Sequence, residues 1–271
     1  MRDNMDKYLR KNQELWNELT PIHAQSEFYD VEGFKRGRCT LKSIELEEIG
    51  DVSGKCLLHL QCHFGMDTLS WARLGARVTG VDFSDKAIDL ARSLSKEPGI
   101  EASFVCSDIY DLPETLDADF DVVFTSYGVL CWLPDLRRWA EVINHFLRRG
   151  GTFYMVEMHR LLQVFDDSAD CNELRVINSY FPTNDEPLRF EKTGSYADGS
   201  VLLDNESYEW THSLGEVVTA LTGARLRIDF VHEFPVCCYK ALPFMEEDEE
   251  GWWRLKGDKI PLTFSLRATR V

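Results

Sequence analysis

Residues 55–84 decide the fold, and they read KCLLHLQCHFGMDTLSWARLGARVTGVDFS. Cys56 to Leu60 is a short apolar run, which is typical of a strand covered on both faces. Gln61 to Gly65 forms the turn, Asp67 to Leu74 has a helical pattern, and Ala76 to Val81 is a second apolar strand. The stretch therefore predicts a β-α-β unit with a right-handed crossover and a ligand crevice at the carboxyl ends of its strands.

The residues that follow the two strands indicate which ligand the crevice takes. Asp82 ends the second strand, where a carboxylate can accept two hydrogen bonds from a ribose diol. A dinucleotide site needs G-x-G-x-x-G, because its pyrophosphate lies against bare backbone. Here the loop has one glycine, and the side chains of Gln61 and His63 would crowd a pyrophosphate. The pattern favours a ribose cofactor without a phosphate, of which S-adenosylmethionine is the common one; an ordinary turn with a solvated Asp82 is the alternative.

Five stretches, taken in order, resemble the motifs of the class I S-adenosylmethionine-dependent methyltransferases. They are LLHLQCHFG (57–65), VTGVDFS (78–84), SFVCSDIYDLP (103–113), FDVVFTSYGVLCWLPD (120–135) and FLRRGGTFYMVEMH (146–159). The resemblance covers roughly residues 50–160, and the LQCHFG loop resembles that of a bacterial-type subgroup. It implies a Rossmann-like enzyme that uses S-adenosylmethionine.

Three residues depart from the first motif of that family. His59 occupies a position that is usually acidic, and Gln61 and His63 occupy two usual glycines. The usual acid helps to hold the methionine ammonium of the cofactor, and a neutral imidazole can accept a hydrogen bond there without neutralising the charge. The family likeness favours a subgroup that binds the methionine end differently. A non-catalytic binding or regulatory protein that keeps the fold is the alternative.

The resemblance also implies roles for particular residues. Asp82 is expected to bind the ribose hydroxyls, and Phe83 to pack on the adenine unless it is a core aromatic. Asp108 is expected to accept a hydrogen bond from the adenine amine, while the backbone N–H of Ile109 reaches a ring nitrogen. The remaining expected cofactor contacts are Gln61, Cys62, His63, Gly65, Ser126, Tyr127 and Tyr29.

Methyl transfer mainly requires that the two reactants are held in line and that water is excluded, and a base is needed only for a protonated acceptor. His159 ends the predicted fifth strand and has a reference pKa of about 6.5, so it is the candidate base. Glu157 is expected to orient it; a structural histidine is the alternative. Further acceptor-side candidates are Tyr127, Trp132, Tyr180, Tyr208, Trp210 and His212.

The alternation of strands and helices predicts the architecture. We expect an α/β, Rossmann-like, doubly wound and mostly parallel seven-stranded sheet whose last strand, near Pro261 to Arg270, is antiparallel. The expected divisions are residues 1–50 as a helical cap or lid, 51–160 as the cofactor-binding core, 161–212 as an inserted acceptor-side subdomain, and 213–271 as the rest of the sheet.

Two flanking segments carry further expectations. Residues 3–19 predict an amphipathic helix ended by Pro21, and the aromatic loop after it offers the lid candidates His23, Phe28, Tyr29 and Phe34. Turn residues in the insertion, such as Asn184–Asp185 and Asp198–Gly199, predict hairpins. Residues 246–250, EEDEE, are expected to form a solvated acidic loop.

Charge and composition limit the function further. The net charge of −16 argues against nucleic acid and anionic membranes, which need a cationic surface. The eight cysteines have no CxxC spacing, so they indicate small core residues in a reducing compartment. The chain has no apolar run of membrane-spanning length.

These limits lead to an expected setting. We expect a cytoplasmic monomer or homodimer with a small-molecule methyl acceptor and no metal. A nucleic-acid or protein methyltransferase stays a further alternative; an oxidoreductase is disfavoured by the glycine-poor loop.

Overall fold

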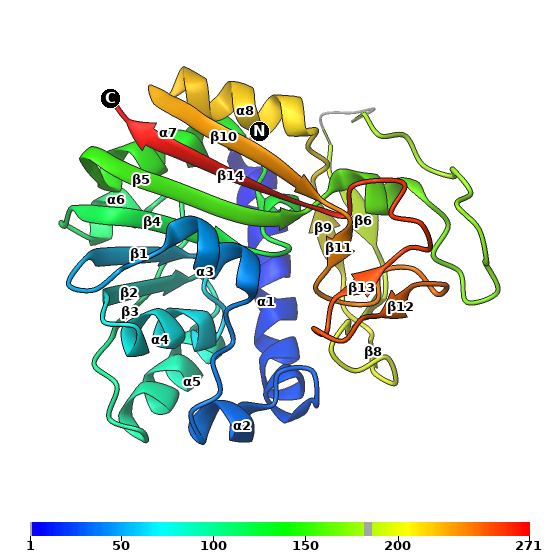
Figure 1. Ribbon diagram of the computed structural model, residues 1–271, viewed down its shortest axis with the longest axis horizontal. Coiled ribbons are helices and arrows are strands. Elements are labelled where there is room, and N and C mark those ends of the chain that lie inside the picture. Colours follow the sequence, from blue (N-terminus) through cyan, green and yellow to red (C-terminus); the bar gives the residue numbers. More distant parts are fainter. Residues whose placement is uncertain (1, 182–185) are drawn as a thin grey trace.

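The structure is a computed structural model that describes residues 2–181 and 186–271. Its main sheet contains β1 (Cys56–Leu60), β2 (Arg77–Asp82), β3 (Ser103–Cys106), β4 (Phe120–Ser126), β5 (Leu147–Met158), β10 (Leu226–Phe234) and β14 (Thr263–Arg270). The strand order is β10-β14-β5-β4-β1-β2-β3. β14 is antiparallel to both neighbours and the other pairs are parallel, which confirms the predicted doubly wound sheet (Figure 1).

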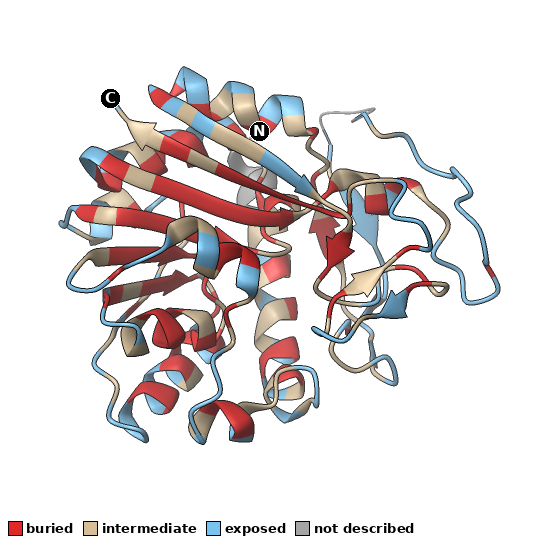
Figure 2. Cartoon of the chain, viewed as in Figure 1, coloured by how far each residue is buried: buried red, intermediate tan, exposed pale blue. Residues whose placement is uncertain are grey.

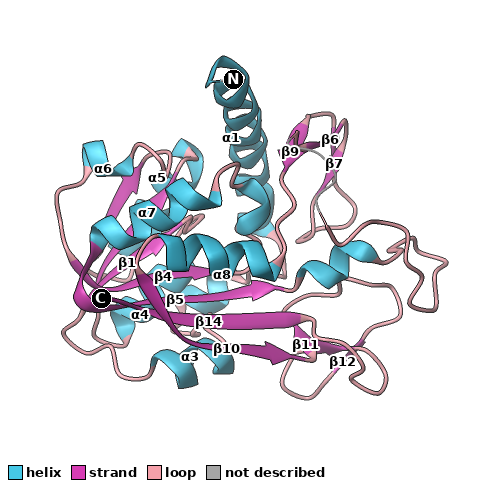
Figure 3. Cartoon of the chain, turned by 90° about the horizontal axis from the view of Figure 1, so that it is seen from above, coloured by secondary structure: helices cyan, strands magenta, loops and turns pink. Residues whose placement is uncertain are grey.

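Helices cover both faces of this sheet. α3 (Ser43–Ile49), α4 (Met66–Arg73) and α5 (Asp85–Lys96) pack on one face, and α6 (Leu112–Thr115), α7 (Leu136–Phe146) and α8 (Leu214–Gly223) on the other. Figure 3 shows α7 and α8 on the side of the sheet opposite to α3. Two apolar faces covered in this way explain why the central strands are almost continuously hydrophobic and buried (Figure 2).

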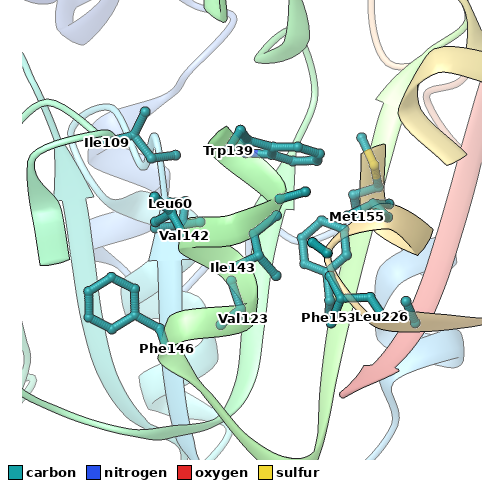
Figure 4. Packing of buried hydrophobic residues seen from close by; sticks show 14 of the residues in the cluster. Leu60, Ile109, Val123, Trp139, Val142, Ile143, Phe146, Phe153, Met155 and Leu226 are labelled. Atoms are coloured by element: carbon teal, nitrogen blue, oxygen red, sulfur yellow. The ribbon is translucent and has the colours of Figure 1, made fainter. Parts of the chain in front are cut away.

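The larger core lies between α7 and the sheet. Trp139 and Ile143 of α7 are fully buried against Val123 of β4 and Phe153 of β5 (Figure 4). α7 begins where the Asp135 side chain accepts a hydrogen bond from the Arg138 N–H, which satisfies one of the free donors of the first turn. This packing holds the loop after β4 against the sheet, and that loop later forms a wall of the site.

The first helix is longer than the sequence predicts. α1 (Arg2–Gln25) continues through Pro21, so the predicted stop there is wrong. A proline inside a helix removes one backbone hydrogen bond, and here the next turn is held by burial of Thr20 and His23. The Gln13 amide donates to the Phe83 carbonyl at 2.6 Å, so α1 lies across the carboxyl edge of the sheet.

The short α2 (Val31–Lys35) follows α1. Phe34 is fully buried there beside Phe64 of the core, with the Arg73 guanidinium 4.1 Å from its ring centroid. Phe34 is therefore a core residue and not part of a lid.

A second lobe faces the carboxyl edge of the sheet (Figure 1). It contains η1 (Leu130–Trp132), η2 (Arg160–Val164), β6 (Leu188–Phe190), β7 (Thr193–Gly194), β8 (Leu202–Leu203), β9 (Ser207–Glu209), β11 (Val236–Cys237), β12 (Glu246–Glu247) and β13 (Trp253–Arg254). β6 pairs with β9, β7 with β8, and β11, β13 and β12 form a three-stranded sheet. Its own apolar cluster comprises Leu162, Cys237, Leu242, Met245, Leu255 and Leu262.

The lobe confirms part of what the sequence predicts and corrects another part. The Val201 N–H donates to the Asp198 carbonyl, which closes the predicted turn between β7 and β8, whereas Pro182, Asn184 and Asp185 lie outside the described residues. Residues 236–255 leave the main sheet, contrary to the expected C-terminal division. The acidic run is also partly structured, because Asp248 accepts from the Trp252 N–H and pairs with Arg254 at 2.7 Å.

Three further observations concern the cysteines, the helices and side chains that could bind a metal ion. All eight cysteines are free, and Cys106 is exposed at the end of β3 rather than buried as expected. None of the helices within residues 2–181 and 186–271 combines the length and apolarity that a membrane crossing requires. The same ranges hold no group of three or more His, Cys, Asp and Glu side chains suited to a metal ion.

Candidate active site

A cavity of about 660 Å³ lies between the carboxyl edge of the sheet, α1 and the lobe. Its size falls in the range of about 300–1,000 Å³ that small-molecule sites occupy. The loops after β1 and β4 meet in it, and the order of the strands reverses between these two, where ligands bind in open α/β sheets. Every residue predicted to contact the cofactor lines this cavity: Tyr29, Gln61, Cys62, His63, Gly65, Asp82, Phe83, Asp108, Ile109, Ser126 and Tyr127.

Asp82 is held firmly at the end of β2. One carboxylate oxygen accepts from the His63 N–H at 2.8 Å and the other from the Ser84 N–H at 2.9 Å. A carboxylate offers about four acceptor positions, so two remain for a ligand in the cavity. Burial raises the pKa of Asp82 to about 6. The structure therefore places a fixed acceptor of hydrogen bonds where the sequence predicts the ribose contact.

The loop after β1 has an unusual backbone. Gln61, His63 and Gly65 have φ angles of +55°, +51° and +75°, which is the left-handed region. These are the three positions at which the resembling family has glycines, so this chain keeps the glycine conformation at two residues with side chains. A non-glycine residue pays about 1–2 kcal/mol for this conformation. The consequence is a loop that puts an amide and an imidazole where the family leaves open space.

This strain gives a testable expectation at Gln61. Its Nε2 donates to the Val129 carbonyl at 3.1 Å, while its Oε1 is buried without a hydrogen-bond partner in the described part of the chain. Gln61→Ala removes these contacts and keeps the backbone strain, whereas Gln61→Gly removes both. We expect the glycine variant to be about 1 kcal/mol more stable than the alanine variant in urea unfolding. Equal stability, or a more stable alanine variant, would contradict the assigned conformation.

The family usually has an acid at the position of His59, and in this chain Asp67 supplies a carboxyl group in its place. His59 is buried, its Nδ1 lies 2.8 Å from the Thr68 hydroxyl, and burial lowers its pKa to about 3, so the imidazole is neutral. Asp67, in the first turn of α4, lines the same cavity. Its carboxylate accepts hydrogen bonds from Thr40 at 2.5 Å and Ser126 at 3.3 Å. Burial raises the pKa of Asp67, and the Thr40 and Ser126 hydroxyls oppose this increase. The carboxyl group at this end of the cavity is therefore that of Asp67.

Tyr127 lines the cavity with its hydroxyl already engaged. The hydroxyl donates to Glu45 of α3 at 2.9 Å, and the φ angle of Tyr127 is +27°. Burial raises the pKa of Glu45 to about 7 and holds the pKa of Tyr127 well above its usual value. A tyrosine this weakly acidic is a poor proton carrier, so its part in catalysis stays a prediction.

Aromatic rings close the cavity on the side of α1. The His63 ring lies 5.1 Å from Trp16 and 5.2 Å from His23, and Tyr29 stacks on His23 with centroids 5.3 Å apart. The Tyr29 and Tyr196 hydroxyls are 2.5 Å apart, and this hydrogen bond joins the segment between α1 and α2 to the lobe. The nitrogens of His23, Trp16 Nε1 and His63 Nε2 are buried without partners in the described residues. A polar ligand that forms hydrogen bonds with these atoms would therefore stabilise the cluster.

His159 lies outside the large cavity. Its Nδ1 accepts from the Leu161 N–H at 3.2 Å and its Nε2 lies 3.1 Å from Glu233, so both nitrogens are engaged. Glu157 does not orient it, because that carboxylate accepts from backbone N–H groups of the loop after β4. His159 is thus engaged away from the cavity, and its role as a base stays a prediction.

Most of the other acceptor-side candidates also face away from the cavity. Trp132 lines it, but Tyr208 packs on Tyr8 at 4.5 Å, and the ring of His212 lies 2.7 Å from the Leu133 carbonyl. Tyr180 accepts a hydrogen bond from the Leu214 N–H, and Trp210 lines a separate space of about 60 Å³ together with His159 and His212.

Sequence reasoning missed four carboxylates that line the cavity: the exposed Glu27 and Glu247, and the more buried Asp67 and Glu209. Asp67 was placed at a helix start without a role. Glu209 lies between Tyr208 and Trp210, and side chains of adjacent strand residues point to opposite faces. Because the two aromatic residues are buried, the alternation alone indicates that Glu209 faces the other way.

Comparisons with known proteins agree with this geometry. Residues 58–155 match a family model described as a methyltransferase domain. The solved structure of an S-adenosylmethionine-dependent methyltransferase from Clostridium acetobutylicum is 16% identical, with a TM-score of 0.55 over 96% of this chain and 98% of that one. Residues 58–155 thus match a methyltransferase domain, and the chain has the fold of S-adenosylmethionine-dependent methyltransferases.

The curated relatives match this chain over only part of their length. A ubiquinone biosynthesis O-methyltransferase from Xanthomonas euvesicatoria pv. vesicatoria is 26% identical over 141 residues, which is 51% of this chain and 59% of the relative. One from Xylella fastidiosa is 28% identical over 52% of this chain and 58% of the relative. The matched part thus spans less than two thirds of these relatives. A Listeria monocytogenes methyltransferase structure, 17% identical with a TM-score of 0.58, covers 84% of this chain and 96% of that one and shares its fold.

The residues of the methyltransferase domain fit its cofactor. A carboxylate with two remaining acceptor positions suits the ribose diol, and a second carboxylate suits the methionine ammonium. The buried and unpartnered Gln61 Oε1 and His63 Nε2 in the loop between them suit a polar ligand. When bound, S-adenosylmethionine supplies a methyl group activated by a sulfonium.

Proposed function

We propose that this protein transfers the methyl group of S-adenosylmethionine to a small aromatic molecule. One observation carries the proposal: a single cavity joins the ribose-binding edge of the sheet to an aromatic wall contributed by the lobe. The cofactor occupies the part next to the loops after β1, β2 and β3. The acceptor occupies the part next to the loop after β4 and the lobe.

The adenosine end uses the ends of β2 and β3. Asp82 accepts hydrogen bonds from the ribose hydroxyls, and Phe83, Asp108 and Ile109 surround the adenine. Asp108 is fixed in part by the Tyr110 N–H, which donates to its Oδ1 at 2.7 Å. A carboxylate held by its own backbone is already oriented, so little conformational freedom is lost on binding.

The methionine end of the cofactor binds at Asp67, which replaces the acid that is absent from the first motif of this chain. Asp67 binds the ammonium group, and its orientation is set by the Thr40 and Ser126 hydroxyls. Lys42 lines the same part of the cavity, 4.9 Å from the centroid of Trp252, and pairs with the cofactor carboxylate. Neutral His59 completes this wall without adding charge.

The role of Asp67 leads to a selective effect on binding. We expect Asp67→Asn to weaken S-adenosylhomocysteine about tenfold or more, because a charge-assisted hydrogen bond contributes about 1.5–3 kcal/mol. Binding of 5′-methylthioadenosine, which lacks the amino acid part, should change little. Calorimetry with both ligands measures the difference, and Asp51→Asn at the surface is the matched control. Equal weakening of both ligands would place the ammonium elsewhere.

The acceptor part of the cavity is suited to an aromatic ring. Trp132, Tyr196, Tyr239 and Trp253 line it from four different segments, and Met158 lines it from the end of β5. Aromatic side chains favour stacked or edge-to-face contacts with a planar ligand. The relatives named for ubiquinone biosynthesis O-methylation support an acceptor with a hydroxyl on a ring.

The decisive test starts with the cofactor and continues with acceptors. Calorimetry should show saturable binding of S-adenosylhomocysteine. Incubation with S-adenosylmethionine and a panel of phenols, catechols and aromatic amines should then release S-adenosylhomocysteine, with the methylated product identified by mass spectrometry. A protein that binds neither form of the cofactor would refute the enzyme function.

A further inference from the structure

Two acidic side chains of the lobe line the cavity: Glu209, and Glu247 of β12, which is exposed. Glu209 is half-buried at the end of β9 and lines the cavity together with Cys131, Trp132 and Leu133 of the loop after β4. The Trp210 N–H donates to the Cys131 carbonyl at 2.7 Å, which fixes β9 beside that loop. Glu209 therefore faces the space that the cofactor loops leave to an acceptor.

The backbone around Glu209 is fixed from a second side as well. The Asn12 amide of α1 donates to the Tyr208 carbonyl at 2.7 Å and accepts from the Tyr208 N–H at 2.8 Å. Asn12 is fully buried, so this pair of hydrogen bonds is shielded from water. A carboxylate on a strand held from both sides has the positional precision that catalysis requires.

The carboxylate of Glu209 has no hydrogen bond or ion pair within residues 2–181 and 186–271. Arg160 is the cation that lowers the pKa of Glu209. Its Nη1 and Nη2 donate to Gln163 and to the Ser179 carbonyl, and its Nε is buried without a partner in the described residues. A half-buried carboxylate without a partner is costly unless a ligand supplies one.

We propose that the Glu209 carboxylate is the general base that takes the proton from an aromatic hydroxyl of the methyl acceptor. The inference rests on the proposed function and deepens it by naming the substrate class, a phenol or catechol. The hydroxyl oxygen forms the bond to the methyl carbon as the sulfur–carbon bond breaks and its electron pair stays on sulfur. The hydroxyl proton passes to a Glu209 oxygen and leaves to water after product release.

The electrostatic surroundings suit this task. Burial raises the pKa of Glu209 to about 7, and Arg160 of η2 opposes the increase. Cys131 of η1 is the other titratable group that faces Glu209, and burial holds the pKa of its thiol well above the usual value, so it stays neutral. Glu209 thus becomes ionised near neutral pH, where a general base is most effective. The rate should rise with pH through about 7.

The experiment compares wild type, Glu209→Gln and Glu191→Gln. Glutamine keeps the shape and an acceptor oxygen but cannot take up a proton. Glu191 is an exposed carboxylate of the same lobe, paired with Arg189 at 3.5 Å, and serves as the matched control. Catechol is the probe: its binding to the S-adenosylhomocysteine complex is followed by calorimetry, and its methylation from pH 5.5 to 9 by product release.

We expect Glu209→Gln to bind S-adenosylhomocysteine as wild type does and to lose about 10²–10⁴-fold in methylation rate, together with the rise near pH 7. Infrared titration adds a readout without turnover. The carboxylic acid band that titrates near pH 7 should be smaller in Glu209→Gln than in wild type and Glu191→Gln by the contribution of one carboxyl group, because Glu45 titrates in the same range and remains in all three proteins.

Three results would overturn the inference while the cofactor still binds. They are a Glu209→Gln rate within threefold of wild type, an unchanged pH profile in that variant, and failure of wild type to bind or methylate catechol. Loss of S-adenosylhomocysteine binding by wild type would instead refute the proposed function itself.

Discussion

Replacement of Asp82 by alanine should weaken S-adenosylhomocysteine binding by more than tenfold. Two charge-assisted hydrogen bonds to the ribose are lost, and each contributes about 1.5–3 kcal/mol. The substitution also frees the His63 and Ser84 N–H groups that the carboxylate now accepts from, so the loop after β1 loses its orientation. The effect should therefore exceed that of any single change at the methionine end.

Two ligands and one control variant make the Asp82 result specific. Calorimetry with 5′-methylthioadenosine should show the same loss as S-adenosylhomocysteine, because both ligands carry the ribose; Asp67→Asn should affect only the latter. Asp89→Ala, which removes an exposed carboxylate on α5, should bind both ligands normally. Unchanged dissociation constants in Asp82→Ala would show that the ribose lies elsewhere.

The acidity of Asp82 adds a dependence on pH. Burial raises its pKa to about 6, so the free protein carries more neutral Asp82 as the pH falls through 6. The neutral acid is a weaker acceptor, and cofactor affinity should decrease below about pH 6. The same increase means that folding takes up a proton between the unfolded pKa, about 3.9, and about 6. Asp82 therefore favours the folded state more at pH 5 than at pH 7.

Glu157→Ala should cause the largest loss of stability, at least about 3 kcal/mol. This buried carboxylate accepts four backbone N–H groups, those of Gly128, Val129, Leu130 and Met158. Leaving a buried donor without a partner costs about 1–3 kcal/mol. Gly128 to Leu130 also begins the wall of the cavity, so cofactor binding should weaken as well.

A series of variants in urea unfolding checks the role of Glu157. Glu157→Gln keeps one acceptor oxygen and should lose less stability than Glu157→Ala. Glu141→Ala, at an exposed position on α7, should stay within about 0.5 kcal/mol of wild type. A Glu157→Ala variant as stable as Glu141→Ala would refute this account of the loop.

The regular core of the fold could be predicted because its periodicities are simple. Cys56–Leu60 has the predicted bounds, and the helix and the strand that follow it begin and end within one residue of theirs, since apolar runs mark buried strands and the helix between them. Pro21 misled the prediction because tertiary packing can outweigh one lost backbone hydrogen bond. The second lobe was seen only in part, because its strands of two or three residues are too short to show a period.

The candidate site, like the fold, could be predicted only in part. Loops at the ends of predicted strands were found, because topology alone brings them to one edge. The left-handed backbone at Gln61 and His63 could not be derived from side chains that normally avoid it. The partner of a side chain is set by distant segments, so the sequence did not show that His159 faces Glu233 or that Glu209 has no partner. His159 is the expected base because of its place at the end of a strand and its intrinsic pKa, and neither gives the direction of its ring.

The contacts of α1 affect how the cavity responds to pH and to ionic strength. Three neutral amides on this helix, Asn12, Gln13 and Asn17, join it to the lobe and to the two residues that follow β2. Amides do not titrate, and salt screens them far less than it screens exposed ion pairs. A change of pH should therefore alter the protonation of the carboxyl groups inside the cavity, while the amide hydrogen bonds that hold α1 over it persist. Added salt should leave these hydrogen bonds in place as well.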